Sequence, residues 1–276
     1  MGSVKQSFDL TDKVAVITGG SGLLGVKHAE AIAEFGGIPI LLDIDNKTSV
    51  KKAIRISDEY QVDCEFKLCN IADEKQILSV RDALLRKYGR IDILINNAAI
   101  DPKVKKTSNK NLSRLENFSI AQWNLELSVG LTGAMLCCKI FGYEMAKKGK
   151  GVILNISSDL GIIAPDQRIY KKEGLPDYEQ SVKPVTYSVI KHGIIGLTKY
   201  LATYWADKEV RCNALCPGGI ITNQETEFVK QLIDLIPLGR MAQEDEYKSA
   251  IVFLVSDASK YMNGAIIPMD GGRSIW

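Results

Sequence analysis

Short runs of β-branched residues alternate along this chain with longer stretches of helical periodicity, and no other feature of the sequence limits the fold as strongly. The runs are KVAVIT (13–18), IPILLD (38–43), CEFKLC (64–69), DILINN (92–97), GVILNIS (151–157), VRCNALC (210–216) and AIIPM (265–269). Helical patterns such as 24–35, 47–60 and 73–88 separate them. Alternation of this kind predicts βαβ units, and hence an α/β fold whose parallel sheet of about seven strands is covered by helices on both faces.

The whole chain of 276 residues, 1–276, is expected to form one domain, because it contains no repeat, low-complexity segment or Pro/Gly/Ser linker. Single α/β units commonly reach about 250 residues. Two segments interrupt the alternation: residues 101–117 are polar and basic, and residues 165–184 carry three prolines without clean periodicity. Both follow strand ends, where open α/β sheets bind ligands, so we expect both insertions to bind the substrate.

A glycine-rich loop, VAVITGGSGLLG, follows the first run and precedes a helix. Gly19, Gly22 and Gly25 allow a tight turn, a close approach to a pyrophosphate and packing of helix on strand. Asp43 ends the second run, where its carboxylate can accept hydrogen bonds from the adenosine ribose. A carboxylate would repel a 2′-phosphate, and the loop has no Arg or Lys to neutralise one. The pattern predicts a Rossmann-type fold that binds NAD rather than NADP.

In the stretch YSVIK (187–191), Tyr187 and Lys191 are four positions apart. On a helix this spacing places both side chains on one face, so that an ammonium lies beside a phenol. A phenol with the ordinary pKa of about 10 is a poor base at neutral pH, and an adjacent cation makes it useful. On its own, such a pair is far more typical of an amphipathic surface than of a catalytic site, so its meaning depends on the rest of the chain.

Six motifs occur in a characteristic order: TGGSGLLG, NNAA (96–99), NISS (155–158), YSVIK, VRCNALCPGGIIT (210–222) and DGG (270–272). Together they resemble the short-chain dehydrogenase/reductase family over almost the whole chain. The resemblance implies that Tyr187 is the general acid/base, that Lys191 lowers its pKa and holds the nicotinamide ribose, and that Ser158 binds the substrate oxygen. Ser157 is the less favoured candidate for that last role.

The resemblance also implies a set of cofactor-binding residues around the glycine loop and the later strand ends. These are Gly19, Ser21, Gly22, Leu23, Leu24, Gly25, Asp43, Asn70, Ile71, Asn97, Tyr187, Lys191, Pro217, Gly218, Ile220 and Thr222. The family's habit of pairing the helix at about 186–206 and its C-terminal region further implies a homotetramer or homodimer.

The chain departs from the family pattern at several positions. The glycine spacing has Leu23 where the short form of the family has glycine, and Asn70 stands where an aspartate usually faces the adenine. Gly130 replaces an asparagine that orients a water in the proton relay, so the glycine leaves room for another water or the relay is lost. Ser158 and Tyr187 are 29 positions apart, against roughly a dozen in relatives, which indicates an insertion beside the active site.

We therefore expect an NAD(H)-dependent oxidoreductase that interconverts a secondary alcohol and a ketone. Cations in the insertions favour a small polar or anionic substrate such as a sugar or sugar phosphate; they are Lys103, Lys105, Lys106, Arg168, Lys171, Lys172 and Lys183. Tyr170 and Tyr178 could cover a sugar ring. The alternatives are a 3-oxoacyl-type reductase and a catalytically silent NAD-binding protein.

Composition excludes several other classes of function. The formal net charge is +2, which gives no electrostatic reason to expect nucleic acid or a membrane surface as a partner. The six cysteines form no C-x-x-C pair, and His28 and His192 have no metal-ligand spacing relative to them, so no metal site is expected. With reduced thiols, no apolar signal segment and no apolar run near the ~18 residues that span a bilayer, we expect a cytoplasmic protein.

Overall fold

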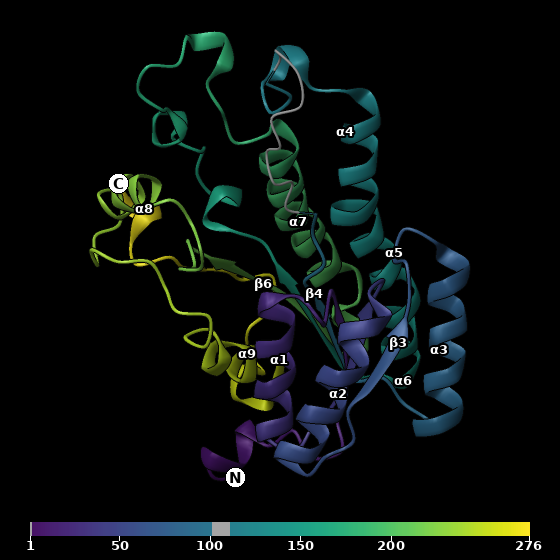
Figure 1. Cartoon of the computed structure of the whole chain (residues 1–276). Coiled ribbons are helices and arrows are strands. Elements are labelled where there is room, and N and C mark those ends of the chain that lie inside the picture. Colours follow the sequence, from purple (N-terminus) through teal and green to yellow (C-terminus); the bar gives the residue numbers. More distant parts are fainter. Residues whose placement is uncertain (1, 101–110) are drawn as a thin grey trace.

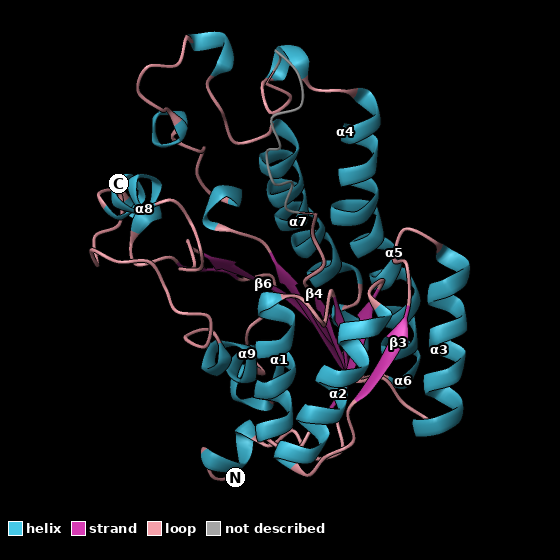
Figure 2. Ribbon diagram, in the orientation of Figure 1, coloured by secondary structure: helices cyan, strands magenta, loops and turns pink. Residues whose placement is uncertain are grey.

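Seven parallel strands form one sheet in the part of the chain that the computed structural model describes, residues 2–100 and 111–276 (Figures 1 and 2). They are β1 (Val14–Thr18), β2 (Ile38–Asp43), β3 (Glu65–Leu68), β4 (Ile93–Asn96), β5 (Gly151–Ile156), β6 (Val210–Pro217) and β7 (Ile266–Met269). Each lies within one residue of the run that predicted it. The predicted doubly wound parallel sheet is confirmed.

The strand order is β3-β2-β1-β4-β5-β6-β7, so the connections run outward in one direction from β1 and in the other from β4. Val16 pairs with Ile40 of β2 on one side and with Leu94 of β4 on the other. Loops that leave β1 and β4 therefore diverge above the carboxyl ends of these strands. Open α/β sheets bind their ligands in the crevice formed at such a point.

Helices cover both faces of the sheet (Figure 1). One layer contains α1 (Leu23–Glu34), α2 (Asn46–Tyr60) and α9 (Lys248–Val255), and the other contains α3 (Glu74–Tyr88), a long helix over Ile120–Lys148 and α7 (Val185–Tyr204). Every residue of β1 is buried, because a parallel sheet covered on both faces must be apolar on both. The continuous apolar runs in the sequence have this cause.

The long helix is interrupted by two π-helical turns. Its parts are α4 (Ile120–Leu127), a turn over Ser128–Gly133, α5 (Ala134–Cys137), a turn over Cys138–Gly142, and α6 (Tyr143–Lys148). Among the described residues this helix alone is long and apolar enough to cross a membrane. Half of its most apolar window is buried, and Phe141 and Met145 are fully buried against the sheet, so we assign it to the core.

The second insertion folds back on the described end of the first. Asn111 donates from Nδ2 to the carbonyl of Glu179 (3.0 Å), and Arg114 donates from Nη1 to the carbonyl of Asp177 (2.6 Å). Ile169 is buried against α8 (Thr226–Ile233) and the segment that follows it. Residues 111–117 and the second insertion thus pack together; Lys103, Lys105 and Lys106 lie outside the described residues.

All six cysteines are free, as predicted from the absence of paired spacing, and five of them are buried in the fold. No group of His, Cys, Asp or Glu among the described residues is arranged to hold a metal ion.

Candidate active site

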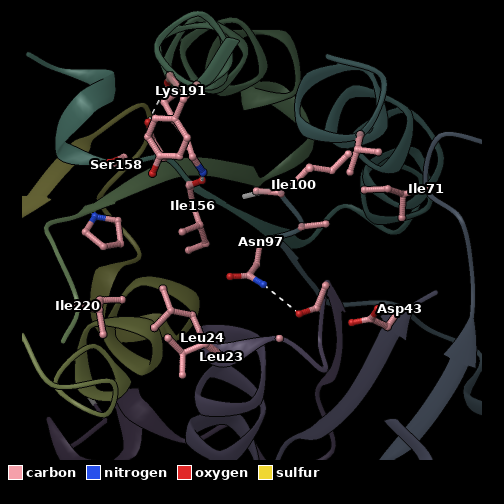
Figure 3. Close-up of a pocket in the computed structure, with 18 of the residues that line it drawn as sticks. Leu23, Leu24, Asp43, Ile71, Asn97, Ile100, Ile156, Ser158, Lys191 and Ile220 are labelled. Carbon is pink, nitrogen blue, oxygen red and sulfur yellow. Dashed lines mark hydrogen bonds between the residues drawn. The ribbon is translucent and has the colours of Figure 1, made fainter. Parts of the chain in front are cut away.

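A cavity of about 900 Å³ opens at the carboxyl ends of the central strands. Its volume lies within the range of small-molecule and cofactor sites. Residues that follow each of the strands β1 to β6 line it, together with residues of α1, the long helix and α7. Figure 3 shows Ser158 and Lys191 at one end of this cavity and Asp43 at the other.

The glycine loop brings the backbone close to the cavity. Gly19 has a φ of +59°, in the left-handed region that glycine adopts without strain. A Cβ on Gly25 would lie 2.1 Å from the carbonyl oxygen of Gly19. The first turn of α1 can therefore pack this closely against the loop only because residue 25 has no side chain. Leu23 and Leu24 at the start of α1 line the cavity, which places a positive helix end beside it. This cradle fits the pyrophosphate of a dinucleotide.

Asp43 is fixed at the end of β2 by backbone donors. Its Oδ2 accepts from the Ser21 N–H (3.1 Å), and its Oδ1 accepts from the Ile44 N–H (2.8 Å). Lys52 donates from Nζ to the Ser21 carbonyl oxygen (2.6 Å) and does not line the cavity. The acidic side chain is therefore the charged group that an adenosine ribose would meet at this end.

Asn97 braces the loop from the neighbouring strand. Its Nδ2 donates to the carbonyl oxygens of Thr18 and Gly19, both at 3.1 Å. Behind the loop, the imidazole of His28 on α1 is completely buried and neither ring nitrogen has a hydrogen-bond partner. Burial lowers the pKa of His28 to about 3, and the nearby Asn97 side chain offsets only part of this effect. His28 is thus a neutral core residue rather than a ligand.

Most of the residues expected to bind the cofactor line this cavity: Gly19, Gly22, Leu23, Leu24, Asp43, Asn70, Ile71, Asn97, Tyr187, Lys191, Pro217, Gly218, Ile220 and Thr222. Ser21 and Gly25 do not line it, although both were expected to contact the cofactor. The Ser21 hydroxyl instead donates to Ser49 on α2, and Gly25 packs against the loop. The structure places both behind the cradle, where they hold its shape.

The expected catalytic side chains meet at the opposite end. Lys191 is buried and donates from Nζ to the Ile156 carbonyl oxygen (3.0 Å), with Nζ 5.7 Å from the centroid of the Tyr187 ring. Ser157 donates its hydroxyl to the Lys191 carbonyl oxygen (2.8 Å), which ties β5 to α7. This bond commits the one proton of the Ser157 hydroxyl to the scaffold.

Gly130 lies in the first π-helical turn and packs against α7. A Cβ at this position would lie 2.8 Å from Ile190 Cγ2, so the Ile190 side chain fills the space beside the glycine. The position that a Cβ would take at residue 130 is therefore occupied by this isoleucine.

The cations of the second insertion divide into two groups. Arg168 is paired with Asp166, Lys171 with Asp177 and Lys172 with Glu225, and none of these cations lines the cavity.

Lys183 is different, because it lines the cavity and its Nζ lies 3.8 Å from the centroid of the Tyr187 ring. The Tyr170 ring packs on Phe228 (centroids 5.5 Å apart), and Tyr178 is exposed, so neither lines the cavity.

Several lining residues were not anticipated, among them Ile100 and Gln224. Gln224 donates from Nε2 to the Ile220 carbonyl oxygen (2.8 Å) and accepts the Thr222 N–H (2.7 Å), so it braces the loop after β6. In the sequence, the only indication that Gln224 belongs to the site is its position two residues after Thr222.

A family model described as Enoyl-(Acyl carrier protein) reductase matches residues 21–274, which is most of the chain. The chain therefore belongs to the short-chain dehydrogenase/reductase family, and its enzymes use a nicotinamide cofactor.

Curated relatives cover nearly the full length. The chain is 31% identical over 278 residues to D-threitol dehydrogenase of Mycolicibacterium smegmatis, covering 99% of this chain and 97% of the relative. It is 31% identical over 279 residues to NAD-dependent glycerol dehydrogenase of Listeria innocua (98% and 97%), and 31% identical over 270 residues to 3-oxoacyl-[acyl-carrier-protein] reductase FabG of Thermotoga maritima (96% and 99%).

A solved structure with the same fold is a gluconate 5-dehydrogenase from Burkholderia cenocepacia in complex with NADP and tartrate. It superimposes with a TM-score of 0.84 at 26% identity and covers 98% of each chain. The names of these relatives thus include dehydrogenases of threitol, glycerol and gluconate and a 3-oxoacyl-[acyl-carrier-protein] reductase; NAD is named for one of them and NADP for another.

Proposed function

We propose that this protein is an NAD(H)-dependent oxidoreductase that interconverts a secondary alcohol and a ketone on a small polar or anionic substrate such as a sugar or sugar phosphate. One observation carries the proposal: Ser158, Tyr187 and Lys191 line the same cavity as Asp43 and the glycine loop, with Ser158 and Lys191 at one end and Asp43 at the other. Similarity to D-threitol and glycerol dehydrogenases supports a polyol-like substrate.

The side chains at the catalytic end suit proton transfer. Tyr187 would accept the hydroxyl proton of the alcohol, and the Lys191 ammonium favours the phenolate form that this requires. Ser158 would donate a hydrogen bond to the oxygen as negative charge develops on it. When bound, the nicotinamide supplies the hydride acceptor for oxidation or the hydride donor for reduction.

The carboxylate of Asp43 supports NAD over NADP. It lines the cavity at the adenosine end, and a 2′-phosphate beside it would meet like charge. Lys52 does not line the cavity, and its Nζ already donates to the Ser21 carbonyl oxygen, which limits its use as a phosphate partner.

The test of the reaction is Tyr187→Phe, which removes the acidic hydroxyl and little else. We expect NAD affinity to stay unchanged and kcat for the best alcohol to fall by about 100-fold or more. Tyr178→Phe is the matched control, because this exposed tyrosine lies outside the cavity and should keep full turnover. Equal turnover in Tyr187→Phe and the control would refute the proposed chemistry.

The position of Lys183 in the cavity wall supports an anionic substrate. It brings a cation to the catalytic end, and Gln167 fixes its backbone by accepting the Lys183 N–H (2.9 Å) and donating to the Lys183 carbonyl oxygen (3.4 Å). A side chain with a fixed backbone loses less entropy when it binds a ligand.

Sorbitol and gluconate make a suitable pair of probes, because they differ at one carbon by a carboxylate. Lys183→Gln should raise KM for gluconate by about tenfold, or roughly 1.4 kcal/mol, and leave KM for sorbitol unchanged. Arg168→Gln, which removes an exposed cation of the same insertion, should change neither. Identical effects of Lys183→Gln on both probes would rule out recognition of the anion.

A 3-oxoacyl-type reductase is the second candidate. Similarity to FabG and the apolar side chains of Ile100, Leu125 and Val129 in the cavity wall favour it. Oxidation of NADH by acetoacetyl-coenzyme A, at a higher kcat/KM than with any polyol-derived ketone, would select this candidate. Tight NAD binding with no turnover on either class of substrate would select the catalytically silent alternative.

We also propose a homotetramer or homodimer that assembles through α7. Val189, Tyr200 and Tyr204 on this helix are exposed, and the two tyrosine rings stack with centroids 5.4 Å apart. Free cysteines support a reducing compartment, and we propose the cytoplasm.

A further inference from the structure

A buried ion pair lies directly behind Ser158 and links it to the C-terminal turn. Arg273 donates from Nη1 to Oδ2 of Asp159 at 2.7 Å, and the two side chains are only 6% and 4% exposed. Asp159 follows Ser158 in a short helical turn (Asp159–Gly161), and Arg273 begins another (Arg273–Ile275). The two residues are 114 positions apart, so the fold alone brings them together.

A contribution to the stability of the fold does not explain well why the protein has this buried ion pair. Burying two charges costs several kcal/mol for each ion, and apolar replacements of buried pairs are often neutral or stabilising. The other contacts of the carboxylate are therefore informative.

Asp159 controls the only proton of the Ser158 hydroxyl. Its Oδ1 lies 2.7 Å from Ser158 Oγ and 2.7 Å from the Leu160 nitrogen. A carboxylate has no proton to give, so the Ser158 hydroxyl must donate to Asp159. Ser158 Oγ also accepts the Leu160 N–H (3.2 Å), and one lone pair remains toward the cavity that Ser158 lines.

During the proposed reaction, Ser158 therefore has two competing acceptors for one proton: Asp159 and the substrate oxygen. The acceptor that carries more negative charge forms the stronger hydrogen bond. Arg273 weakens Asp159 as an acceptor, because it binds the other carboxylate oxygen at 2.7 Å.

We propose that Asp159 and Arg273 form a positioning pair that holds the Ser158 hydroxyl in place at rest and releases it to the substrate oxygen as charge develops there. The inference rests on the proposed function, since it assigns these residues to the same alcohol–ketone reaction. Neither residue touches the substrate; both act through Ser158.

A double-mutant cycle with Ser158 separates this role from a structural one. Arg273→Met should lower kcat by roughly 10- to 100-fold when Ser158 is present, with NAD affinity unchanged. In the Ser158→Ala background the same substitution should change kcat by less than about twofold, because the group it acts through is gone. Arg240→Met is the matched control: Arg240 contacts Glu246 at the same 2.7 Å, but on the surface, and kcat should not change.

Arg273→Met leaves the buried Asp159 carboxylate without its partner, and this could prevent folding. A second variant is therefore needed to separate loss of the fold from loss of the positioning role. Asp159→Asn/Arg273→Met has no buried charge and keeps an oxygen that can accept from Ser158. It should fold and regain most of the lost kcat. Equal losses of kcat in the unmodified and the Ser158→Ala backgrounds, or no recovery in the folded double variant, would overturn the positioning role. If Ser158→Ala alone retains full turnover, the proposed function fails at this residue and the inference fails with it.

Discussion

Gly130→Asn, which introduces the residue usual in the family, tests whether Ile190 excludes a side chain from the π-helical turn. In a helix, asparagine is favoured over glycine by about 0.3–0.5 kcal/mol. Against this gain, the new Cβ would lie 2.8 Å from Ile190 Cγ2 and 3.1 Å from Cδ1. Ile190 is 8% exposed, and a β-branched residue in a helix has one strongly preferred χ1 rotamer, so Cγ2 cannot swing aside.

Overpacking of this kind costs about 1–3 kcal/mol, so the clash outweighs the propensity and the variant should be destabilised by roughly 1–2 kcal/mol. Ile190→Ala alone should lose about 2–5 kcal/mol through the cavity it leaves. In the double variant the asparagine occupies part of that cavity, so the two losses should not add. We expect a favourable coupling of about 1–3 kcal/mol between the two sites.

Urea unfolding followed by the fluorescence of the three tryptophans measures all four proteins at one concentration. Gly196→Asn on α7 is the matched control, because a Cβ there meets no atom within 4 Å; it should leave stability unchanged or raise it by a few tenths of a kcal/mol. Additive losses at positions 130 and 190, or equal effects of the two glycine substitutions, would refute the steric reasoning.

Three further predictions concern the cofactor end, His28 and α7. Asp43→Arg should weaken or reverse the preference for NAD, measured as the ratio of kcat/KM with NAD and NADP, because a repelling carboxylate becomes a phosphate partner; equal use of both cofactors by the unmodified protein would contradict this. The pKa of His28 is about 3 in the fold against about 6.5 when unfolded, so the unfolded state binds the proton first and stability is lost as pH falls from about 6.5 toward 3. His28→Leu should flatten that slope by roughly 1.4 kcal/mol per pH unit, and an unchanged slope in urea titrations at pH 4–6 would show that another group is responsible. Finally, sedimentation at micromolar concentration should give a dimer or tetramer that Tyr200→Glu/Tyr204→Glu weakens, whereas a monomeric unmodified protein would argue against assembly through α7.

The sheet could be predicted from the sequence because local and global constraints agree in it. A strand covered on both faces is apolar at every position, so VAVIT identifies β1 without knowledge of its neighbours. The glycine loop after β1 could be predicted for a similar reason: a Cβ on Gly25 would collide with the Gly19 carbonyl oxygen, so the local geometry itself requires the glycine that the sequence shows. Spacing alone did not show that the Ser21 side chain turns toward Ser49, because that depends on the placement of α2.

Contacts between distant residues were beyond such reasoning. Ile190 follows Tyr187 in the YSVIK motif, but its contact with Gly130 depends on how two helices pack. Arg273 and Asp159 each lie beside a recognised motif, and no periodicity links them. In both cases the pair is informative only once the fold has placed its members.

The cations of the second insertion also show that the sequence alone does not reveal which charged side chains reach the active site. Its sequence contains four cations near the active site, and all four suggest an anionic ligand equally well. In the structure three of them pair with Asp166, Asp177 and Glu225 on the surface, where exposed ion pairs contribute little. Lys183 reaches the cavity because the Gln167 amide holds its backbone immediately before Pro184 and the first turn of α7. Tyr187 lies in that same first turn of α7, so the hydrogen bonds from Gln167 that position Lys183 are also linked to the position of Tyr187. Gln167→Ala should therefore raise KM for gluconate, as Lys183→Gln does.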